Sequence, residues 1–441
     1  MPDSFTSDTL SAMPKLQLQE IHATTIDGAT KGFPGTAQPL RLDELGAMNW
    51  NVLAHDLPFP VAVLKDSALR NNSDQMKKYL DATGVSLSPH GKTTMSPQLF
   101  DRQLAEGAWG LTAATTTHVN VFRKAGVQRV ILANQLVGEQ NVAYIASELK
   151  RDPEFEFYCL VDSIRQADQL AELLLKYAPG RPLNVLVEMG SKNGRCGVRS
   201  LEEGIELARH VSARNDVFCL AGIEVFEAIF GGDPHDAAIK TDGLLGQAVK
   251  LAEECDEAGL FGTSELLLTA GGTMYFARAA RALLKASVSR KTTVVLRSGC
   301  YLTHDHGLYA KGAEFEKEQT SGDHPEFIPA LEVWASVQSV PEPGLAILAL
   351  GKRDISYDIQ LPMVCYSAEG GRARAVAPGN YEIVALNDQH AYMRCPAGQE
   401  PKPGDLFGLG ISHPCTTFDK WQLLYIVDDD YRVVEGIRTF F

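Results

Sequence analysis

The sequence has no long hydrophobic run. No stretch of its 441 residues approaches the roughly 20 consecutive apolar residues that a membrane-spanning helix needs. The first residues, MPDSFTSDTLSAMPKLQLQE, carry early acidic side chains and lack the apolar segment of a secretory signal. We therefore expect a cytoplasmic protein that does not associate with membranes.

Basic residues are in the minority. The chain has 41 Lys and Arg against 55 Asp and Glu, which gives a formal net charge of -14. Proteins that bind the phosphates of nucleic acids need a concentrated basic surface, so we expect no nucleic-acid partner. The hydrophobic fraction of 45% and the charged fraction of 22% are typical of a soluble globular protein. The length favours two domains over one.

The eight cysteines include no CxxC pair. Cys159 in FEFYCLV and Cys219 in VFCLAGI lie inside apolar runs, where a reduced cysteine behaves as a small hydrophobic residue. In a cytoplasmic chain we expect free thiols, of which at most one or two carry chemistry.

From about residue 60 to residue 300, short apolar runs alternate with longer amphipathic segments. In segments such as 142–151 and 164–178, apolar residues recur three and four positions apart, which predicts helices. The alternation predicts an α/β fold with a parallel sheet. There is one run more than a (β/α)₈ barrel needs, so we take the first as an outlying strand. The runs are 61–64, 85–87, 109–113, 129–133, 155–161, 183–188, 218–225, 265–269 and 293–296.

The pattern changes after about residue 325. Short runs of strand type are separated by PEPG, EGG, PGN and KPGD, which are turn sequences. We predict an N-terminal extension over 1–40, a barrel over 41–325 and a mostly antiparallel β domain over 326–441. The strand-like runs of the last domain are 332–340, 345–350, 373–376, 382–386, 391–394 and 421–427.

Two glycine-containing loops follow the last two predicted barrel strands. A barrel has its active site at the C-terminal ends of its strands and often binds phosphate in the loops after strands seven and eight. Glycine lets the backbone approach an anion, hydroxyls donate hydrogen bonds, and the N-terminus of a helix favours negative charge. Neither loop is specific alone, but together they predict a phosphate site. The two loops are Thr269-Ala270-Gly271-Gly272-Thr273 and Arg297-Ser298-Gly299-Cys300-Tyr301.

Lys92 lies in the segment SPHGKTTM, where the first predicted barrel strand ends. A lysine at a strand end usually only solvates a loop. A lysine facing a phosphate site, however, suggests pyridoxal phosphate, whose aldehyde bonds to a lysine amine. Lys65 and Lys192 are alternatives for this role. Lys65 follows the outlying strand, and Lys192 lies in the loop GSKNGRCG, where it could equally contact an anion.

His413 and Cys415 are two positions apart, so in an extended chain their side chains point the same way. Imidazole and thiolate together suit zinc. The HxC spacing is common, however, and two ligands do not hold a structural zinc, so an interpretation without a metal stays open. His304 and His306 have the same spacing, and we interpret them mainly as part of a barrel loop.

The order of these motifs resembles the fold-type III pyridoxal-phosphate enzymes, in the branch of D-serine dehydratase, D-threonine aldolase and D-threo-3-hydroxyaspartate dehydratase. The resemblance runs from about Pro58 to the C-terminus and is carried by PFPVAVLKDSALRNN, PHGKTTMSPQLF, AGGT, SGCY and HPCTTFDKW. It implies an alanine-racemase-like barrel followed by a β domain, and a homodimer. It also implies that Lys92 bonds the cofactor and that Arg195 approaches its ring. The residues that it implies around the cofactor phosphate are Gly271, Gly272, Thr273, Gly299, Cys300 and Tyr301.

The resemblance further implies that His413 and Cys415 bind a divalent metal, with zinc first and manganese or magnesium as alternatives. The dehydratases of the branch carry HxC, whereas its aldolases tend to have aspartate in the second position. Two positions depart from the family. A pattern like KTHK is replaced here by Lys92 followed by Thr93, Thr94 and Met95, and Phe226 replaces a tyrosine near the ring nitrogen.

These observations predict a dehydratase of D-3-hydroxy amino acids. Lys92 would hold the cofactor and remove the α-proton, and the metal would coordinate the β-hydroxyl, giving a 2-oxo acid and ammonia. Three alternatives stay open. Retro-aldol cleavage would release glycine and an aldehyde, a racemase would need no metal, and a non-catalytic cofactor-binding protein would turn nothing over. The sequence does not choose the side chain of the small amino acid substrate.

Overall fold

The computed structural model describes residues 15–319 and 324–441. Residues 1–14, on which most of the prediction about a secretory signal rests, lie outside the described part. The described remainder of the predicted extension packs onto the molecule. It forms a small hairpin of β1 (Thr25–Ile26) and β2 (Leu40–Arg41), and it buries Ile26 and Phe33.

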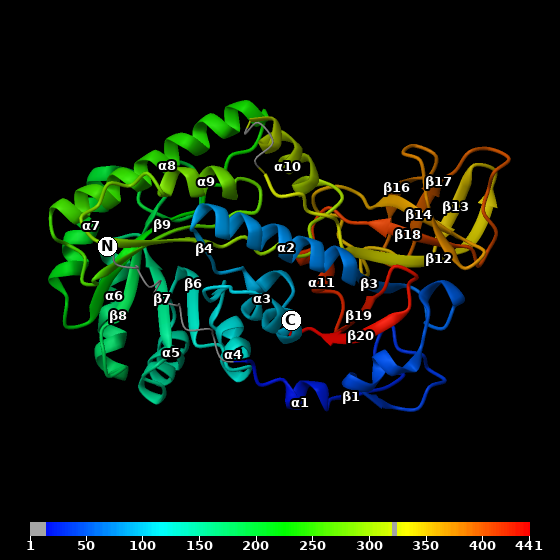
Figure 1. Cartoon of the computed structure of the whole chain (residues 1–441), viewed down its shortest axis with the longest axis horizontal. Coiled ribbons are helices and arrows are strands. Elements are labelled where there is room, and N and C mark those ends of the chain that lie inside the picture. Colours follow the sequence, from blue (N-terminus) through cyan, green and yellow to red (C-terminus); the bar gives the residue numbers. More distant parts are fainter. Residues whose placement is uncertain (1–14, 320–323) are drawn as a thin grey trace, which may run out of the picture.

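The first large sheet is curled and contains eight parallel strands in the order β4-β11-β10-β9-β8-β7-β6-β5 (Figure 1). An isolated parallel bridge from His90 to Thr112 links its two edge strands. Eight of the predicted runs are these strands, so the predicted alanine-racemase-type α/β fold is confirmed. The strands are β4 (Ser86–Leu87), β5 (Leu111–Ala113), β6 (Arg129–Gln135), β7 (Glu156–Val161), β8 (Leu183–Met189), β9 (Phe218–Val225), β10 (Glu265–Ala270) and β11 (Lys291–Leu296).

Helices cover the outer face of this sheet (Figure 1). Side chains alternate along each strand, so one set faces the helices and the other fills the interior. The interior set is a separate cluster with one residue from each of six strands: Ile131, Leu160, Leu186, Ala221, Leu267 and Val295. The helices are α2 (Asp66–Thr83), α3 (Pro97–Ala105), α4 (Thr116–Lys124), α5 (Glu139–Arg151), α6 (Ile164–Tyr177), α7 (Leu201–Ala213), α8 (Pro234–Glu257), α9 (Phe276–Leu283) and α10 (Leu308–Gln319).

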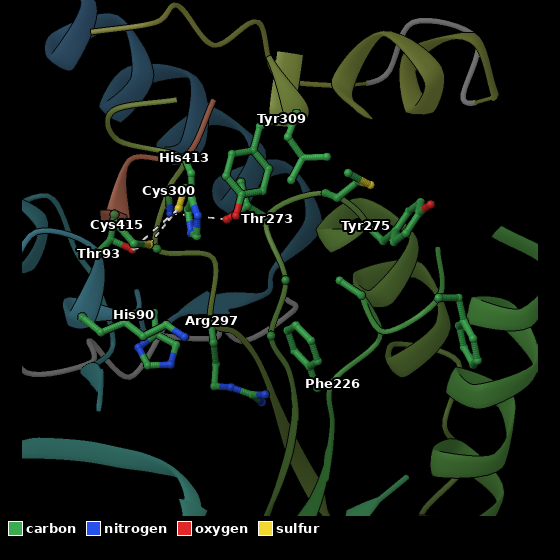
Figure 2. Close-up of a pocket in the computed structure, with 18 residues that line it drawn as sticks. His90, Thr93, Phe226, Thr273, Tyr275, Arg297, Cys300, Tyr309, His413 and Cys415 are labelled. Atoms are coloured by element: carbon green, nitrogen blue, oxygen red, sulfur yellow. Dashed lines mark hydrogen bonds between the residues drawn. The ribbon is translucent and has the colours of Figure 1, made fainter. Parts of the chain in front are cut away.

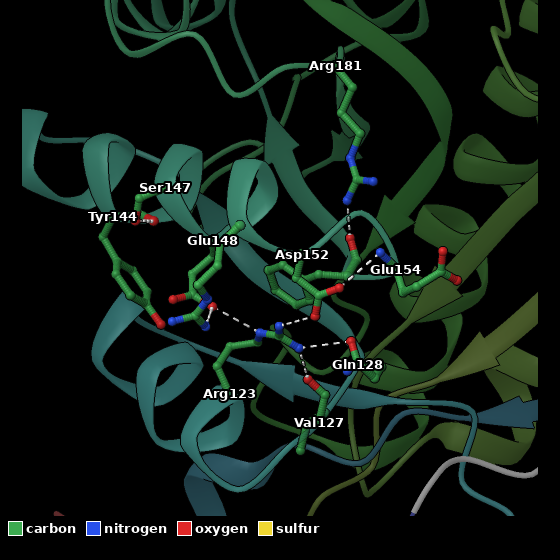
Figure 3. Close-up of polar contacts among 11 residues, drawn as sticks. Arg123, Val127, Gln128, Tyr144, Ser147, Glu148, Asp152, Glu154 and Arg181 are labelled. Atoms are coloured by element: carbon green, nitrogen blue, oxygen red, sulfur yellow. Dashed lines mark hydrogen bonds and ion pairs between the residues drawn. The ribbon is translucent and has the colours of Figure 1, made fainter.

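Arg123 ties the end of α4 to α5 and to the strands beside them (Figure 3). Its guanidinium donates to Glu148 at 3.1 Å, to the Val127 carbonyl at 2.6 Å and to Asp152. It also lies 4.1 Å above the ring of Phe155. Because Arg123 and Glu148 are buried and mutually paired, this network is structural and does not face the strand ends that carry the site.

The strand β3 (Val61–Lys65) lies outside the barrel sheet, as expected from the surplus run, and the structure adds it to the second sheet. It pairs antiparallel with β12 and parallel with β19. The second sheet is otherwise antiparallel, as predicted, and includes three strands that the pattern did not indicate: β14, β18 and β20. Its other members are β12 (Leu331–Glu342), β13 (Leu345–Leu348), β14 (Met363–Glu369), β15 (Arg372–Ala375), β16 (Glu382–Leu386), β17 (Ala391–Arg394), β18 (Leu406–Gly410), β19 (Leu423–Val427) and β20 (Val433–Arg438).

Two observations bear on the compositional predictions. Among the described helices, none combines the length and the apolar character needed to cross a bilayer. All eight cysteines are free thiols. Cys159 is buried, as expected for a cysteine within an apolar segment, whereas Cys219 is only partly buried.

Candidate active site

The PHGK segment closes the barrel sheet. The Leu87 carbonyl accepts a hydrogen bond from the Trp109 amide at 2.7 Å, and the Pro89 carbonyl accepts one from the Thr112 amide at 2.9 Å. These bonds join the end of β4 and the residues after it to β5 and the residues before it. Gly91 then packs against Phe122, where a Cβ atom would lie 2.4 Å from the ring. Gly91 anchors a 3₁₀ turn (Gly91–Thr93) from which the exposed Lys92 projects.

A cavity of ≈ 320 Å³ opens at the C-terminal ends of the barrel strands (Figure 2). Most of the predicted site residues line it together: Lys92, Gly271, Gly272, Thr273, Gly299, Cys300, His413 and Cys415. Lys92 makes no hydrogen bond or ion pair within the described part of the chain, so its amine is available to a ligand.

Two predicted residues do not line the cavity. Arg195 is exposed and lies 4.1 Å above the ring of Phe226, which does line it. Tyr301 is buried and packs against Phe327 with a ring-centroid distance of 6.1 Å. The structure thus brings Arg195 to the edge of the site and turns Tyr301 toward the core.

The alternative lysines lie elsewhere. Lys65 donates to the Asp428 carbonyl at 3.0 Å and its ammonium sits 3.8 Å above the ring of Tyr431, in the second sheet. Lys192 is exposed and does not line the cavity. Of the three lysines, Lys92 alone reaches the cavity.

A buried ion pair forms the floor of the cavity. Arg297 lines the cavity and binds the carboxylate of Glu224, and it donates to the Thr269 hydroxyl at 2.8 Å. Both charged side chains are almost fully buried. Burial raises the pKa of Glu224, and Arg297 opposes that shift. No local motif indicates this pair, because its members are 73 residues apart in the sequence.

A second buried carboxylate lies beneath the first glycine loop. Glu227 accepts a hydrogen bond from the Gly271 amide at 3.1 Å, and a Cβ atom on Gly272 would lie 2.5 Å from its Oε1. Burial raises the pKa of this carboxyl. The Gly271 amide is therefore already engaged, which leaves the Thr273 hydroxyl and the second loop as the more accessible donors for an anion.

His90 also lines the cavity. Its Nδ1 is buried and has no hydrogen-bond partner among the described residues. Burial lowers the pKa of His90 far below its ordinary value, and the positive charges of Lys92 and Arg297 add to this shift. His90 is therefore neutral near pH 7 and offers a ring nitrogen to whatever occupies the cavity.

His413 follows β18, and Cys415 is the first residue of the short helix α11 (Cys415–Phe418). Both lie at the end of the cavity near Thr93 and Cys300 (Figure 2). Asp358 accepts from His413 Nδ1 at 2.5 Å, and the Cys415 sulfur lies 3.8 Å from that of Cys300. Hydrogen bonds to Cys415 and Asp358 raise the pKa of His413 to about 9. Hydrogen bonds from Cys300 and His413 lower the pKa of Cys415.

The His304 and His306 pair does not join this group. His304 packs against Phe327, and burial lowers the pKa of each histidine to about 4. Asp305 between them accepts from the amides of Tyr309 and Ala310 at the start of α10, which is a helix cap. The predicted loop interpretation agrees with this structure.

The cap places Tyr309 at the site. Its side chain lines the cavity, as that of Cys300 does. Sequence reasoning did not select Tyr309. The available signal was Asp305 three residues before an amphipathic segment, which is typical of a helix N-terminus.

These residues fit the two groups that the sequence implied. A free lysine amine, an unpartnered His90 Nδ1, the unpartnered Nε of Arg297 and the Thr273 hydroxyl surround a cavity of suitable chemistry for a phosphorylated pyridine aldehyde. His413 and Cys415 offer imidazole and thiolate, and the Asp358 contact is the outer-shell carboxylate that often orients a metal-binding histidine.

Family models match both parts of the chain. Residues 65–266 match "Alanine racemase, N-terminal domain" and residues 330–427 match "Putative serine dehydratase domain". The chain belongs to the fold-type III pyridoxal-phosphate enzymes. Its homologues are lyases, and it is an enzyme of that class.

Curated relatives carry out two reactions on 3-hydroxy amino acids. D-threonine aldolase of Arthrobacter sp is 27% identical over 384 residues, which cover 86% of this lyase and 90% of the relative. D-threo-3-hydroxyaspartate dehydratase of Delftia sp. (strain HT23) is 25% identical over 226 residues, covering 49% of this chain and 53% of the relative. The relatives thus support a D-3-hydroxy amino acid as the class of substrate, but they differ in the reaction that they catalyse.

Solved structures agree on the fold. The D-threonine aldolase from Filomicrobium marinum superposes with a TM-score of 0.71 at 22% identity, covering 87% of this chain and 95% of that one. A Cys-to-Ala mutant of D-threo-3-hydroxyaspartate dehydratase in the metal-free form gives a TM-score of 0.66 at 20% identity, covering 89% and 99%. At this identity the likeness speaks for the fold alone.

Glu188, at the end of β8, is a buried carboxyl on the rim of the barrel. It accepts from Gln135 at 2.6 Å, and burial together with the neighbouring Glu224 raises its pKa to about 8 from the ordinary 4.5. A carboxyl whose pKa is raised by folding stabilises the protein below pH 4.5, and this contribution is lost as the pH rises toward 8.

We therefore expect Glu188→Gln to weaken the pH dependence of stability. Between about pH 5 and pH 8 the free energy of unfolding of the unmodified protein should fall by up to about 4 kcal/mol more than that of the variant. Urea unfolding at both pH values measures the difference. Glu206→Gln, on an exposed face of α7, is the control and should follow the unmodified protein. If the free energy of unfolding changed equally with pH in Glu188→Gln and in the unmodified protein, Glu188 would be ionised in the folded state at neutral pH.

Proposed function

We propose that this lyase is a pyridoxal-phosphate- and divalent-metal-dependent dehydratase of D-3-hydroxy amino acids such as D-serine or D-threonine. It would convert them to a 2-oxo acid and ammonia. The observation that carries the proposal is that Lys92 lines the same cavity as His413 and Cys415. This shared lining supports a single ligand that meets the lysine amine on one side and the imidazole and thiol on the other.

The residues on the lysine side of the cavity would act at the α-carbon of the substrate. Pyridoxal phosphate, when bound, would delocalise the electron pair that is left on the α-carbon when the α-proton is removed. Lys92 Nζ, which has no competing partner in the described residues, would take that proton as general base. Arg297 keeps a positive charge on the floor, held by Glu224 and Thr269, while the neutral His90 adds none.

The metal side of the cavity handles the leaving group. Hydroxide leaves poorly at neutral pH, and a divalent ion supplies the Lewis acidity that this step needs. His413 and Cys415 would hold the ion. Asp358 fixes the orientation of the His413 ring through Nδ1, and two protein ligands leave positions for a substrate oxygen.

The thiolate ligand supports dehydration. Solved structures of the related D-threo-3-hydroxyaspartate dehydratase include a His-to-Ala mutant and a Cys-to-Ala mutant in the metal-free form, and the two mutated positions are two residues apart. His413 and Cys415 have the same residue types and spacing. A thiolate also favours zinc over manganese or magnesium, so we propose zinc as the metal.

Retro-aldol cleavage is the second candidate, and one observation favours it. The relative with 27% identity over 86% of this chain is a D-threonine aldolase. The same lysine and metal would serve that reaction, in which the β-hydroxyl loses a proton and the bond between the α- and β-carbons breaks.

The products separate the candidates. With D-serine and D-threonine we expect ammonia and a 2-oxo acid in equal amounts, and no turnover of the L-enantiomers as matched controls. Both products are measured in the same reaction, by glutamate-dehydrogenase and 2-oxo-acid assays. Glycine with an aldehyde would identify the aldolase, and an inverted α-carbon without ammonia would identify a racemase. No turnover on a panel including 3-hydroxyaspartate would favour a cofactor-binding protein without activity.

The proposal also covers the cellular location, the oligomeric state and the partners of the enzyme. We propose a cytoplasmic homodimer that takes a small amino acid and no nucleic acid. The segment around Asp358 supports self-association, because Tyr357, Ile359 and Leu361 expose large apolar side chains beside the site.

A further inference from the structure

We propose that Cys300 is a third protein ligand of the metal, so that one ion is bound by His413, Cys415 and Cys300. The inference rests on the metal site of the proposed function and deepens it, because it changes the number and softness of the ligands. From the sequence, Cys300 was expected only in the phosphate loop.

The distance between the two sulfurs carries the argument. Cys300 Sγ and Cys415 Sγ are 3.8 Å apart, and both thiols are free. Two thiolates bound to one zinc at about 2.3 Å with tetrahedral angles have sulfurs about 3.8 Å apart. A disulfide would instead need about 2.05 Å. The two sulfurs are thus already at the spacing of a shared ion.

Cys300 is held in place by its backbone, which frees its side chain for this role. Its amide donates to the Thr273 hydroxyl at 3.3 Å, and its carbonyl accepts from the His304 amide at 2.7 Å. The backbone therefore belongs to the phosphate loop, while the sulfur points to the other end of the cavity (Figure 2). One residue would connect the cofactor loop with the metal.

The surroundings of Cys300 differ from those of the structural cysteines. Cys159 and Cys255 belong to the apolar core. The Cys300 sulfur instead lies 3.7 Å from the Thr93 hydroxyl and lines the cavity together with Tyr309. A buried thiol that lines the cavity of the site and faces a second thiol is not explained by packing alone.

His413, which lines the same cavity, would complete the set. The three ligand atoms do not yet all lie within 4.8 Å of one another. Within residues 15–319 and 324–441 that spacing is met by Asp162, Glu188 and Cys196. Binding by His413, Cys415 and Cys300 therefore requires the imidazole to move closer to the two sulfurs, which are already 3.8 Å apart.

The competing trio is less suited to this ion. It offers two carboxyls and an exposed thiol on the barrel rim, and Glu188 keeps its proton to about pH 8. Two thiolates and an imidazole are the softer set and select zinc over manganese or magnesium. Three protein ligands also leave one tetrahedral position, as catalytic zinc sites do.

Zinc X-ray absorption of the purified holoenzyme, loaded with one equivalent of zinc under reducing conditions, tests this inference. Pyridoxal phosphate contains no zinc or sulfur, so the number of zinc–sulfur contacts reports the protein ligands alone. We expect two sulfurs in the unmodified enzyme and one in Cys300→Ser and in Cys415→Ser. Zinc affinity of Cys300→Ser, measured against a chromophoric chelator, should fall by roughly 100-fold or more, because loss of an outer-shell partner alone costs about 10–100-fold.

Cys196→Ser is the matched control and should keep two sulfurs and its affinity. One sulfur in the unmodified enzyme, or two in Cys300→Ser, would overturn the inference, and loss of sulfur in Cys196→Ser would move the ion to the barrel rim. Cys300→Ala is a second variant in case Cys300→Ser misfolds. In both variants the visible absorbance of the bound cofactor measures whether the site is intact. The ammonia assay tests the proposed function separately. Ammonia release by an enzyme with one zinc-bound sulfur would overturn the inference about Cys300 alone. Two zinc-bound sulfurs in a protein that releases no ammonia would overturn the proposed function alone.

Discussion

Lys92→Ala is expected to remove the visible absorbance of the purified protein and to lower kcat/KM at least about 10³-fold, because the same amine both bonds the cofactor and moves the α-proton. The structure gives the reason for so large an effect. Lys92 is the lysine of the cavity, and Lys65 and Lys192 have other surroundings. No neighbouring amine can replace it there. The spectrum and the ammonia assay are recorded on the same preparations.

The matched control for Lys92→Ala is Lys192→Ala. Lys192 is exposed in the loop after β8 and does not line the cavity, so its removal should leave the visible absorbance unchanged. Thermal unfolding of both variants should be similar to that of the unmodified apoprotein, since Lys92 makes no contact that folding would lose. A band that persists in Lys92→Ala, or one that disappears in Lys192→Ala, would assign the cofactor to another amine.

The barrel could be predicted from the sequence because its strands are buried on both faces. Such strands are continuous apolar runs, such as the one that became β9 (Phe218–Val225), and they are separated by helices of regular period. The strands that were missed have weaker patterns. β18 is LFGLG, in which Gly408 is required because a Cβ atom would lie 2.7 Å from the Trp334 ring. β14 ends in polar residues and exposes part of its length.

The site was predicted only where a local motif marks it. Lys92, the glycine loops, His413 and Cys415 each stand in a short recognisable segment. Asp358 does not, because it meets His413 across 55 residues of chain, and the Arg297–Glu224 pair depends on two strands that become neighbours only through β10. Contacts of this kind follow from the three-dimensional arrangement and leave no periodic signal.

The order of the elements explains how the two halves of the site meet. β3 precedes the barrel in the chain but pairs with β12 and β19 of the second sheet. The chain thus enters the barrel from the second sheet through α2 and returns to it through β12 (Figure 1). This double connection holds the HPC segment against the strand end that carries Lys92. A metal ligand on one sheet can therefore serve chemistry at a lysine on the other.

Removing the metal is expected to abolish dehydration while leaving the cofactor bound. Lewis-acid assistance to the leaving group is worth several kcal/mol, so loss of about 4 kcal/mol would lower the rate about 10³-fold. A chelator, or His413→Ala, should therefore suppress ammonia release from D-serine without removing the visible absorbance that depends on Lys92. Added zinc should restore the chelated enzyme but not the variant. Metal content by mass spectrometry is measured on each sample.

Asp358→Asn provides a graded test of the same site. Asp358 does not line the cavity but accepts from His413 Nδ1, so its loss should weaken zinc binding by about 10–100-fold without abolishing activity at saturating zinc. His413→Ala should not be rescued at any zinc concentration, because it lacks the ligand itself. This difference separates a residue that orients a ligand from the ligand. Full activity in the chelated enzyme would instead show that His413 and Cys415 do not assist the leaving group through a metal, and the reaction would then have to be sought among those that need none.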